Sequence, residues 1–187
     1  MKKNTTLLLI TLLISLTGCG TFLTSPNPND TLGKRTLGRS IDDKRIETQT
    51  SINIKKSLPN FKHSNIRINS YNGIVLLIGQ APDEPFIYMS SQIAKQIQHA
   101  HTIENQLTTN EVSTLSDKIS NMICQFKAKR SLIESNRINY RRIKIMCEQQ
   151  SVFLMGIVTR SEASFIVERI RNIDGVKRII KVFEYLN

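Results

Sequence analysis

Residues 65–79 read NIRINSYNGIVLLIG, and residues 142–156 read RIKIMCEQQSVFLMG. In each stretch, isoleucines alternate with polar residues, a short polar turn follows, and an apolar run then ends in glycine. Alternation of this kind is typical of a half-buried strand, and two such runs around a polar turn indicate a β-hairpin. The chain therefore contains two copies of one small unit.

A helix is expected on each side of both hairpins. In the second copy, residues 120–134 and 163–170 place apolar side chains at helical spacing. In the first copy, we expect the helix before the hairpin to run from about Asp42 to Leu58. Asp42 or Asp43 would be its N-terminal cap.

A last strand closes each unit, which gives the order αββαβ. We predict the α+β class, with a small three-stranded sheet packed on two helices in each unit and the two units packed together. The alternating strands exclude an all-α fold, and the antiparallel hairpins exclude a doubly wound one. The side chains expected in the core are Ile66, Ile68, Leu77, Ile143, Ile145 and Leu154.

The first residues predict the compartment. Lys2 and Lys3 precede an apolar run, Leu7 to Leu16, that is too short for the roughly 20 residues of a membrane-spanning helix but suits a signal peptide. The run ends in Leu16-Thr17-Gly18-Cys19, which resembles a bacterial lipobox. That resemblance implies cleavage after residue 18, acylation of Cys19 and, with Gly20 next, sorting to the outer membrane. A signal peptide with a chance cysteine is the alternative.

The remainder of the chain divides into a linker and two domains. Residues 19–40 contain Pro, Gly, Ser and Asn without apolar periodicity, so we expect a lipidated N-terminus and flexible tether there. The first repeat then spans residues 41–112 and the second spans 113–187.

Both repeats resemble the BON domain family. The matching strings are Asp42-Asp43-x-x-Ile46-Glu47 and Gly73-x-Val75-x-Leu77-x-Gly79 in the first copy, with Val152-Phe153-Leu154-Met155-Gly156 and Gly175-Val176-Lys177-Arg178 in the second. Together with the lipobox, this order resembles outer-membrane lipoproteins that carry two tandem BON domains. The resemblance implies a non-enzymatic protein that binds anionic phospholipid through the first helix of its second domain and supports envelope integrity.

The charge distribution points to the same half of the chain. The 187 residues carry a formal net charge of +11, which favours an anionic partner. Residues 41–112 hold seven basic and seven acidic residues, whereas residues 113–187 hold fourteen basic and seven acidic ones. Aromatic residues make up 6% and tryptophan is absent, which argues against a stacking platform for nucleic acid.

The candidate lipid-binding residues lie on the first helix of the second copy. They are Ile123, Phe126, Lys127, Lys129 and Arg130, an apolar tip with flanking cations as an interfacial helix requires. The resemblance implies the same helix. The alternative is that Ile123 and Phe126 belong to the core and that the cations only solvate the far side.

Other reactive residues offer little chemistry. Cys124 and Cys147 point into one predicted core, and either a disulfide or two buried thiols fits them in an oxidising periplasm. His99 and His101 lack the carboxylates or cysteines of a metal site, so no metal is expected. Without a nucleophile motif or phosphate loop, we expect no enzyme activity and no cofactor.

Two classes of partner remain open. One is an anionic phospholipid membrane. The other is an acidic envelope protein, such as a component of the outer-membrane assembly machinery, docking on the basic face of the second copy. Lipidation of Cys19 would exclude nucleic acid by compartment.

Overall fold

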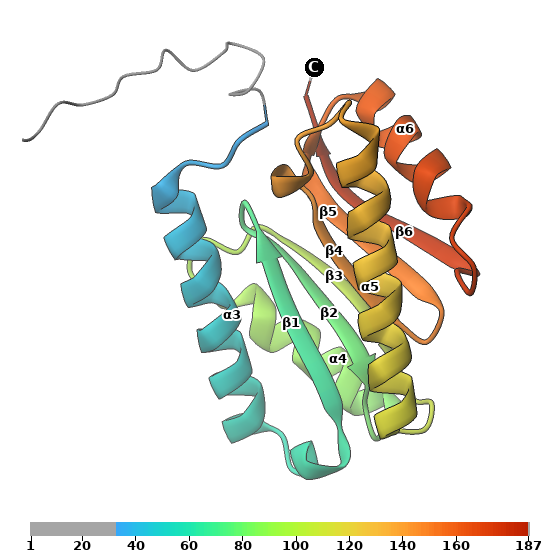
Figure 1. Cartoon of the computed structure of the whole chain (residues 1–187). Helices are drawn as coiled ribbons and strands as arrows, with labels where there is room; N and C mark the ends of the chain where they lie inside the picture. Colours follow the sequence, from blue (N-terminus) through green and yellow to red (C-terminus); the bar gives the residue numbers. More distant parts are fainter. Residues whose placement is uncertain (1–32, 187) are drawn as a thin grey trace, which may run out of the picture. The chain divides into compact units, whose positions relative to one another are not determined.

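The computed structural model describes residues 33–186, and these contain two successive αββαβ units (Figure 1). The first unit consists of α3 (Leu37–Ser57), β1 (Asn65–Tyr71), β2 (Ile74–Gln80), α4 (Glu84–Lys95) and β3 (Thr102–Thr108). The second consists of α5 (Leu115–Ser135), β4 (Lys144–Glu148), β5 (Ser151–Val158), α6 (Arg160–Arg171) and β6 (Arg178–Tyr185). Short 3-10 helices, Phe61–His63 and Tyr140–Arg142, precede β1 and β4. The α+β class and the repeated order are confirmed.

Each unit has its own three-stranded sheet. The central strand, β2 or β5, pairs antiparallel with the strand before it and parallel with the strand after its helix. A parallel neighbour requires a crossover connection, which α4 and α6 provide. The two sheets remain separate, as the repeat predicts.

The central strands are buried on both faces. In β2, Val75 and Leu77 pack with the helices α3 and α4, whereas Leu76 and Ile78 pack against the second sheet. The same alternation holds in β5, where Leu154 faces the helices and Met155 faces the other sheet. The order of layers is therefore helices, sheet, sheet, helices. Burial on both faces explains why these strands are almost continuously apolar instead of alternating.

Most of the predicted core is where we expected it. Leu77, Ile143, Ile145 and Leu154 are buried, each 8% exposed or less. Ile66 and Ile68 are only half-buried, although they pack against the first core. The edge position of β1 does not explain the difference, because Ile145 lies on the edge strand β4 of the second sheet and is buried.

Two helices begin earlier than the apolar periodicity predicts. The first begins at Leu37, with the Thr36 hydroxyl accepting from the Arg39 N–H at 3.2 Å, so the expected cap at Asp42 or Asp43 is wrong. The second begins at Leu115 instead of residue 120. The first turn of each is solvated and adds nothing to the buried face, so periodicity alone cannot show it.

The end of the predicted tether is ordered. Residues 37–40 are helical, and the Arg35 guanidinium lies 4.0 Å from the centre of the Tyr71 ring. The same guanidinium pairs with Asp43 at 2.5 Å. Residues 35–40 of the predicted tether therefore belong to the folded first unit, and residues 19–32, with the signal peptide, lie outside the described residues.

Candidate functional site

The helix α5 is apolar on the side that faces solvent. Its inward side buries Asn121, Ala128 and Leu132, of which Ala128 and Leu132 belong to the second core. Its opposite side exposes six large apolar side chains, here called the outer stripe: Leu115, Ile119, Met122, Ile123, Phe126 and Ile133. An ordinary surface helix has the reverse pattern, and a continuous exposed apolar patch marks an interaction site.

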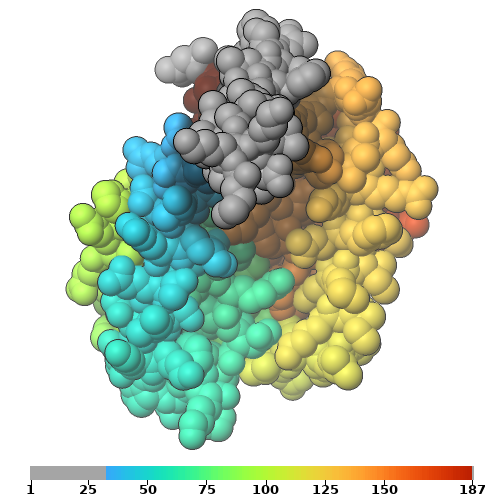
Figure 2. Space-filling view, turned by 60° about the vertical axis from the view of Figure 1, so that its left-hand side comes forward, coloured from blue at the N-terminus to red at the C-terminus, as the bar shows by residue number. Residues whose placement is uncertain are grey.

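The exposure along the outer stripe is large. Leu115 is 75% exposed, and Met122 and Phe126 are each 65% exposed. Figure 2 shows α5, in yellow, lying at the surface with its outer side uncovered by other described elements. The core alternative for Ile123 and Phe126 is therefore wrong.

Cations border the outer stripe on both sides. At 3.6 residues per turn, Lys118 and Lys129 follow one margin and Lys127 follows the other, while Arg130 stands two turns beyond Ile123 in line with it. Arg130 pairs with Glu134 at 2.6 Å, and both side chains are exposed. Within residues 33–186, Lys118, Lys127 and Lys129 form no ion pair, although the Lys129 ammonium lies over the Tyr140 ring, 5.7 Å from its centre. Lys118 and Lys127 therefore have charges available to an anionic surface.

A pocket of about 470 Å³ lies beside the outer stripe. Ile123 and Lys127 of α5 form one wall, and Lys177, from the turn before β6, lies on the lining with Asp174 and Gly175. A Cβ on Gly175 would meet nothing within 4 Å, so this side of the pocket is open. The pocket thus combines two ammonium groups with an apolar side chain shared with the stripe.

The structure therefore brings together the five predicted lipid-site residues, with Lys127 on the pocket flank instead of the same face as Phe126. Sequence reasoning missed four members of the stripe, namely Leu115, Ile119, Met122 and Ile133. Met122 and Ile133 lie inside the predicted helix, and only their exposure in the folded chain shows that they belong to the stripe. For Leu115 and Ile119, the missing signal was the Thr114–Asp117 capping box, in which each side chain accepts from the other's backbone N–H. It marks a helix start five residues earlier than residue 120.

A disulfide connects α5 to the sheet beneath it. Cys124, in the middle of α5, is joined to Cys147 of β4, with their Cα atoms 6.2 Å apart. Cys124 also lines the pocket beside the stripe. The disulfide thus attaches the candidate site to the second core.

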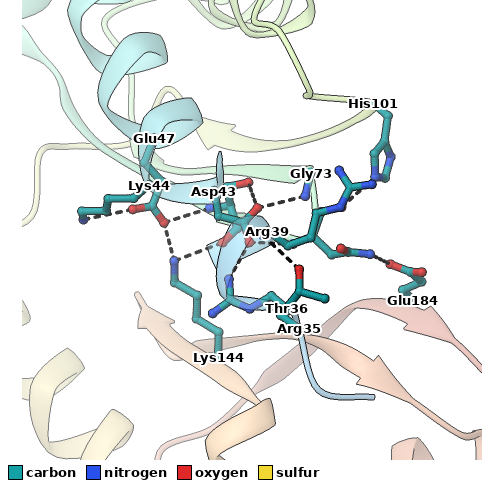
Figure 3. A network of polar contacts seen from close by, with 12 residues as sticks. Arg35, Thr36, Arg39, Asp43, Lys44, Glu47, Gly73, His101, Lys144 and Glu184 are labelled. Carbon is teal, nitrogen blue, oxygen red and sulfur yellow. Dashed lines mark hydrogen bonds and ion pairs between the residues drawn. The ribbon is translucent and has the colours of Figure 1, made fainter. Parts of the chain in front are cut away.

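Asp43 holds the hairpin turn of the first unit from the first turns of α3 (Figure 3). One of its carboxylate oxygens accepts from the Ser70 hydroxyl at 2.7 Å and the Gly73 N–H at 2.9 Å. The other accepts from the Asn72 N–H at 2.8 Å and from Arg35 at 2.5 Å. Burial alone would raise the pKa of Asp43, but the four donated bonds, led by that from Ser70, outweigh it and lower the pKa.

Glu47, one turn further along α3, connects the two units. Its carboxylate accepts from the Ser70 N–H at 3.0 Å and pairs with Lys144 of β4 in the second unit. Burial opposes ionisation, yet the hydrogen bond and charge of Lys144 hold the pKa of Glu47 below its ordinary value. The Asp-x-x-x-Glu part of the family string is thus structural: it orders the first hairpin and joins it to the second unit.

Another carboxylate, which is buried, joins the units at the opposite end of the hairpins. Glu148, 6% exposed, accepts from Gln80 at 2.9 Å and Ser113 at 2.6 Å through one oxygen. Its other oxygen accepts from Arg67 at 2.5 Å and Asn121 at 3.1 Å. Donors from the first sheet, the connecting segment and α5 therefore converge on one anion, which fixes the position of α5.

The remaining candidates carry no further chemistry in the described segment. His101 is engaged, with its Nε2 atom 2.8 Å from the Asn72 carbonyl oxygen and its Nδ1 atom 3.0 Å from the Thr102 hydroxyl. Cys19 lies outside the described residues. From residue 33 to residue 186, no helix has the length and apolarity needed to cross a bilayer.

Comparison with known proteins places the chain in a family. The model of the BON domain matches residues 42–111 and again residues 124–187. The chain is a two-domain BON protein. It is 30% identical over 153 residues to Outer membrane lipoprotein DolP of Haemophilus influenzae, covering 82% of this chain and 79% of that protein. It therefore belongs with the DolP-type outer-membrane lipoproteins.

The chain is also similar to a second curated protein and to solved structures. A protein named 21 kDa hemolysin from Actinobacillus pleuropneumoniae is 28% identical over 152 residues, which is 81% of this BON protein and 78% of the relative. Among solved structures, the C-terminal domain of CdsD, a structural protein of the type III secretion system of Chlamydia trachomatis, shares 14% identity with a TM-score of 0.31. That alignment covers 78% of this chain and 67% of the other.

Proposed function

We propose that this BON protein is a non-enzymatic lipoprotein, acylated at Cys19 and facing the periplasm, that binds anionic phospholipid through α5 and so supports outer-membrane integrity. The observation that carries the proposal is the outer stripe: a helix that turns its large apolar side chains to solvent between two margins of cations. That arrangement suits a helix lying in the membrane interface, with its apolar side among acyl chains and its cations at headgroup level.

The magnitudes are adequate for reversible docking. Fully burying a Leu, Ile, Met or Phe side chain contributes about 1.5–3 kcal/mol, and the stripe residues are about half exposed or more. Each cation near an anionic surface adds on the order of 1 kcal/mol. Acylation at Cys19 would keep the domains close to the bilayer, where such weak contacts suffice.

The pocket beside the stripe supports an anionic headgroup in particular. Lys127 and Lys177 would receive a phosphodiester, while Ile123 continues into the apolar stripe. Asp174, on the same lining, would accept hydrogen bonds from headgroup hydroxyls and disfavour an additional anionic group there.

Sedimentation with vesicles tests the membrane site. Residues 32–187, which form one compact unit, would be mixed with phosphatidylcholine vesicles with and without phosphatidylglycerol. Phe126→Asp should abolish sedimentation while leaving the melting temperature unchanged, because the side chain is largely exposed and does not belong to the second hydrophobic core. Tyr88→Asp on α4 is the matched control, since Tyr88 is 64% exposed against 65% for Phe126.

Charge is tested in the same assay. Lys127→Glu with Arg130→Glu should weaken binding to phosphatidylglycerol vesicles, and the effect should shrink at high salt because exposed charges are screened over about 8 Å at physiological ionic strength. Lys62→Glu with Lys95→Glu in the first unit is the control. If both double variants lose vesicle binding to the same extent, α5 is not the binding site.

The anchor is tested separately. Cys19→Ala should abolish acylation and release the protein into the periplasm, as measured by mass spectrometry and cell fractionation. An unacylated wild-type N-terminus would contradict the proposed anchor without touching the α5 site.

A further inference from the structure

A groove of about 420 Å³ runs between α6 and β6, away from the outer stripe of α5. Ala163 and Val167 of α6 contribute apolar surface to it, and Lys181 and Tyr185 line it from β6. The strand β6 stands at the end of its sheet and, within the described residues, pairs with β5 alone. Its outer row of backbone N–H and C=O groups can therefore accept another strand.

The groove is basic. Arg160 and Arg171 on α6 and Lys181 on β6 all line it, against a single acidic side chain, Glu168. None of the three cations forms an ion pair in the part of the chain that the structure describes. Arg160 lies over the ring of Tyr185, 5.1 Å from its centre, which holds the guanidinium at one end of the groove.

The first unit provides an internal comparison. Asn105 of β3 and Lys181 of β6 hold corresponding places, since they pair with Leu77 and Leu154 of the two central strands. The Asn105 amide donates to the Ile87 carbonyl at 2.9 Å and the Ser91 hydroxyl at 2.6 Å, so it ties β3 to α4. In the second unit a lysine stands at this place and lines an open groove instead.

We propose that the α6–β6 groove binds an extended acidic segment of a partner protein. The segment adds as a strand along β6, and its alternate side chains, about 6.6 Å apart, point toward α6. Carboxylates at these places reach Arg171, Lys181 and Arg160 in turn, while the side chains between them point to the opposite face. This surface and the α5 membrane site use different residues, so the protein can engage both together.

A peptide fits the groove better than a membrane does. The large apolar side chains exposed on the second unit belong to α5, apart from Tyr185, which is 38% exposed. Without a row of large exposed apolar side chains to insert, the groove lacks the contribution that supports an interfacial helix. A β-strand edge beside cations supplies instead the backbone and side-chain partners that a strand requires.

The test uses fluorescence anisotropy with residues 32–187 and a labelled octapeptide that alternates glutamate and valine. We expect saturable binding at low salt, and no comparable binding of the octapeptide that alternates lysine and valine. The double variant Arg171→Glu, Lys181→Glu should bind the glutamate peptide with roughly tenfold lower affinity. Lys95→Glu, the equivalent of Arg171 in the first unit, should leave its affinity unchanged. Amide exchange in β6 should slow when the peptide binds.

Vesicle sedimentation of the same variants separates the groove from the membrane site. The Arg171→Glu, Lys181→Glu variant should retain binding to phosphatidylglycerol vesicles, and Phe126→Asp should retain binding of the peptide. Unchanged peptide affinity in the double variant would overturn the proposal. Loss of vesicle binding without loss of peptide binding in that variant would also overturn it, because the groove would then be part of the membrane surface.

Discussion

Replacing Asp43 by alanine should destabilise the protein far more than replacing its neighbour Asp42. The side chain of Asp43 is buried and accepts four hydrogen bonds. Without it, the Ser70 hydroxyl, which is fully buried, and the buried Gly73 N–H lose their acceptor. Each unsatisfied buried donor costs about 1–3 kcal/mol, whereas the half-buried Asn72 can find water. We therefore expect a loss of about 3 kcal/mol in the free energy of unfolding.

Two further variants separate the hydrogen bonds of Asp43 from the other effects of the substitution. Asp43→Asn keeps the oxygen that serves Ser70 and Gly73 but places an amide against Asn72 and Arg35, so its cost should be about half. Asp42→Ala should lie within about 0.5 kcal/mol of wild type, because no described contact depends on that side chain. Both alanine variants gain the same helix propensity, so their difference isolates the hydrogen bonds.

Urea unfolding at pH 7, followed by far-UV circular dichroism, measures all three variants. The expected order of destabilisation is Asp43→Ala, then Asp43→Asn, then Asp42→Ala. If Asp43→Ala costs no more than Asp42→Ala, the carboxylate does not hold the hairpin, and the structural role assigned to the family string is refuted.

Three further outcomes are expected from other features of the structure and from the pKa values of two carboxylates. The pKa values of Asp43 and Glu47 are lower in the folded state than their ordinary values of 3.8 and 4.5. The two ionised carboxylates therefore stabilise the folded state fully above those ordinary values, and this stabilisation is lost as the pH falls through the folded pKa values. The melting temperature should hence decrease as the pH is lowered from about 5, and it should decrease less steeply in Asp43→Ala. A melting temperature that rises on acidification would contradict this. Reducing the Cys124–Cys147 disulfide, which joins residues 23 apart in the sequence, should lower the free energy of unfolding in urea by about 2–4 kcal/mol. As a control, the stability of the Cys124→Ser, Cys147→Ser variant should not change when reductant is added. Gly79→Ala should strongly destabilise the first unit in thermal melts, because Gly79 has a φ of +120° and the added Cβ would lie 1.9 Å from the Asn65 carbonyl oxygen. Gly38→Ala is the control and should be tolerated, since its Cβ would lie 4.0 Å from its nearest neighbour.

The sequence by itself determined the repeat, the order of elements and the helix that carries the candidate site. These follow from local periodicity: alternating isoleucines define β1, and apolar residues at helical spacing define α6. The concentration of cations after residue 113 was likewise visible without coordinates. The family string also pointed to Asp43 and Glu47, although not to what they do.

Tertiary structure decided which side of each element is covered. Periodicity predicts that Cys124 of α5 faces the core, but it cannot say whether the two cysteines are bonded or that Phe126 faces solvent. Nor can it show that β2 and β5 are covered on both faces, since this depends on one unit packing against the other.

The second hairpin turn shows why such features escape local reasoning. Asn72 and Gly73 adopt φ values of 53° and 83°, as an Asn-Gly pair readily does. Gln149 and Gln150 adopt 43° and 64° without glycine, because distant groups hold them there. The Gln149 N–H donates to Asn121 at 3.1 Å, and the Gln150 carbonyl accepts from the Lys177 N–H at 2.9 Å. Partners 27 or more residues away supply the energy that the local sequence lacks, so only the folded chain reveals the turn.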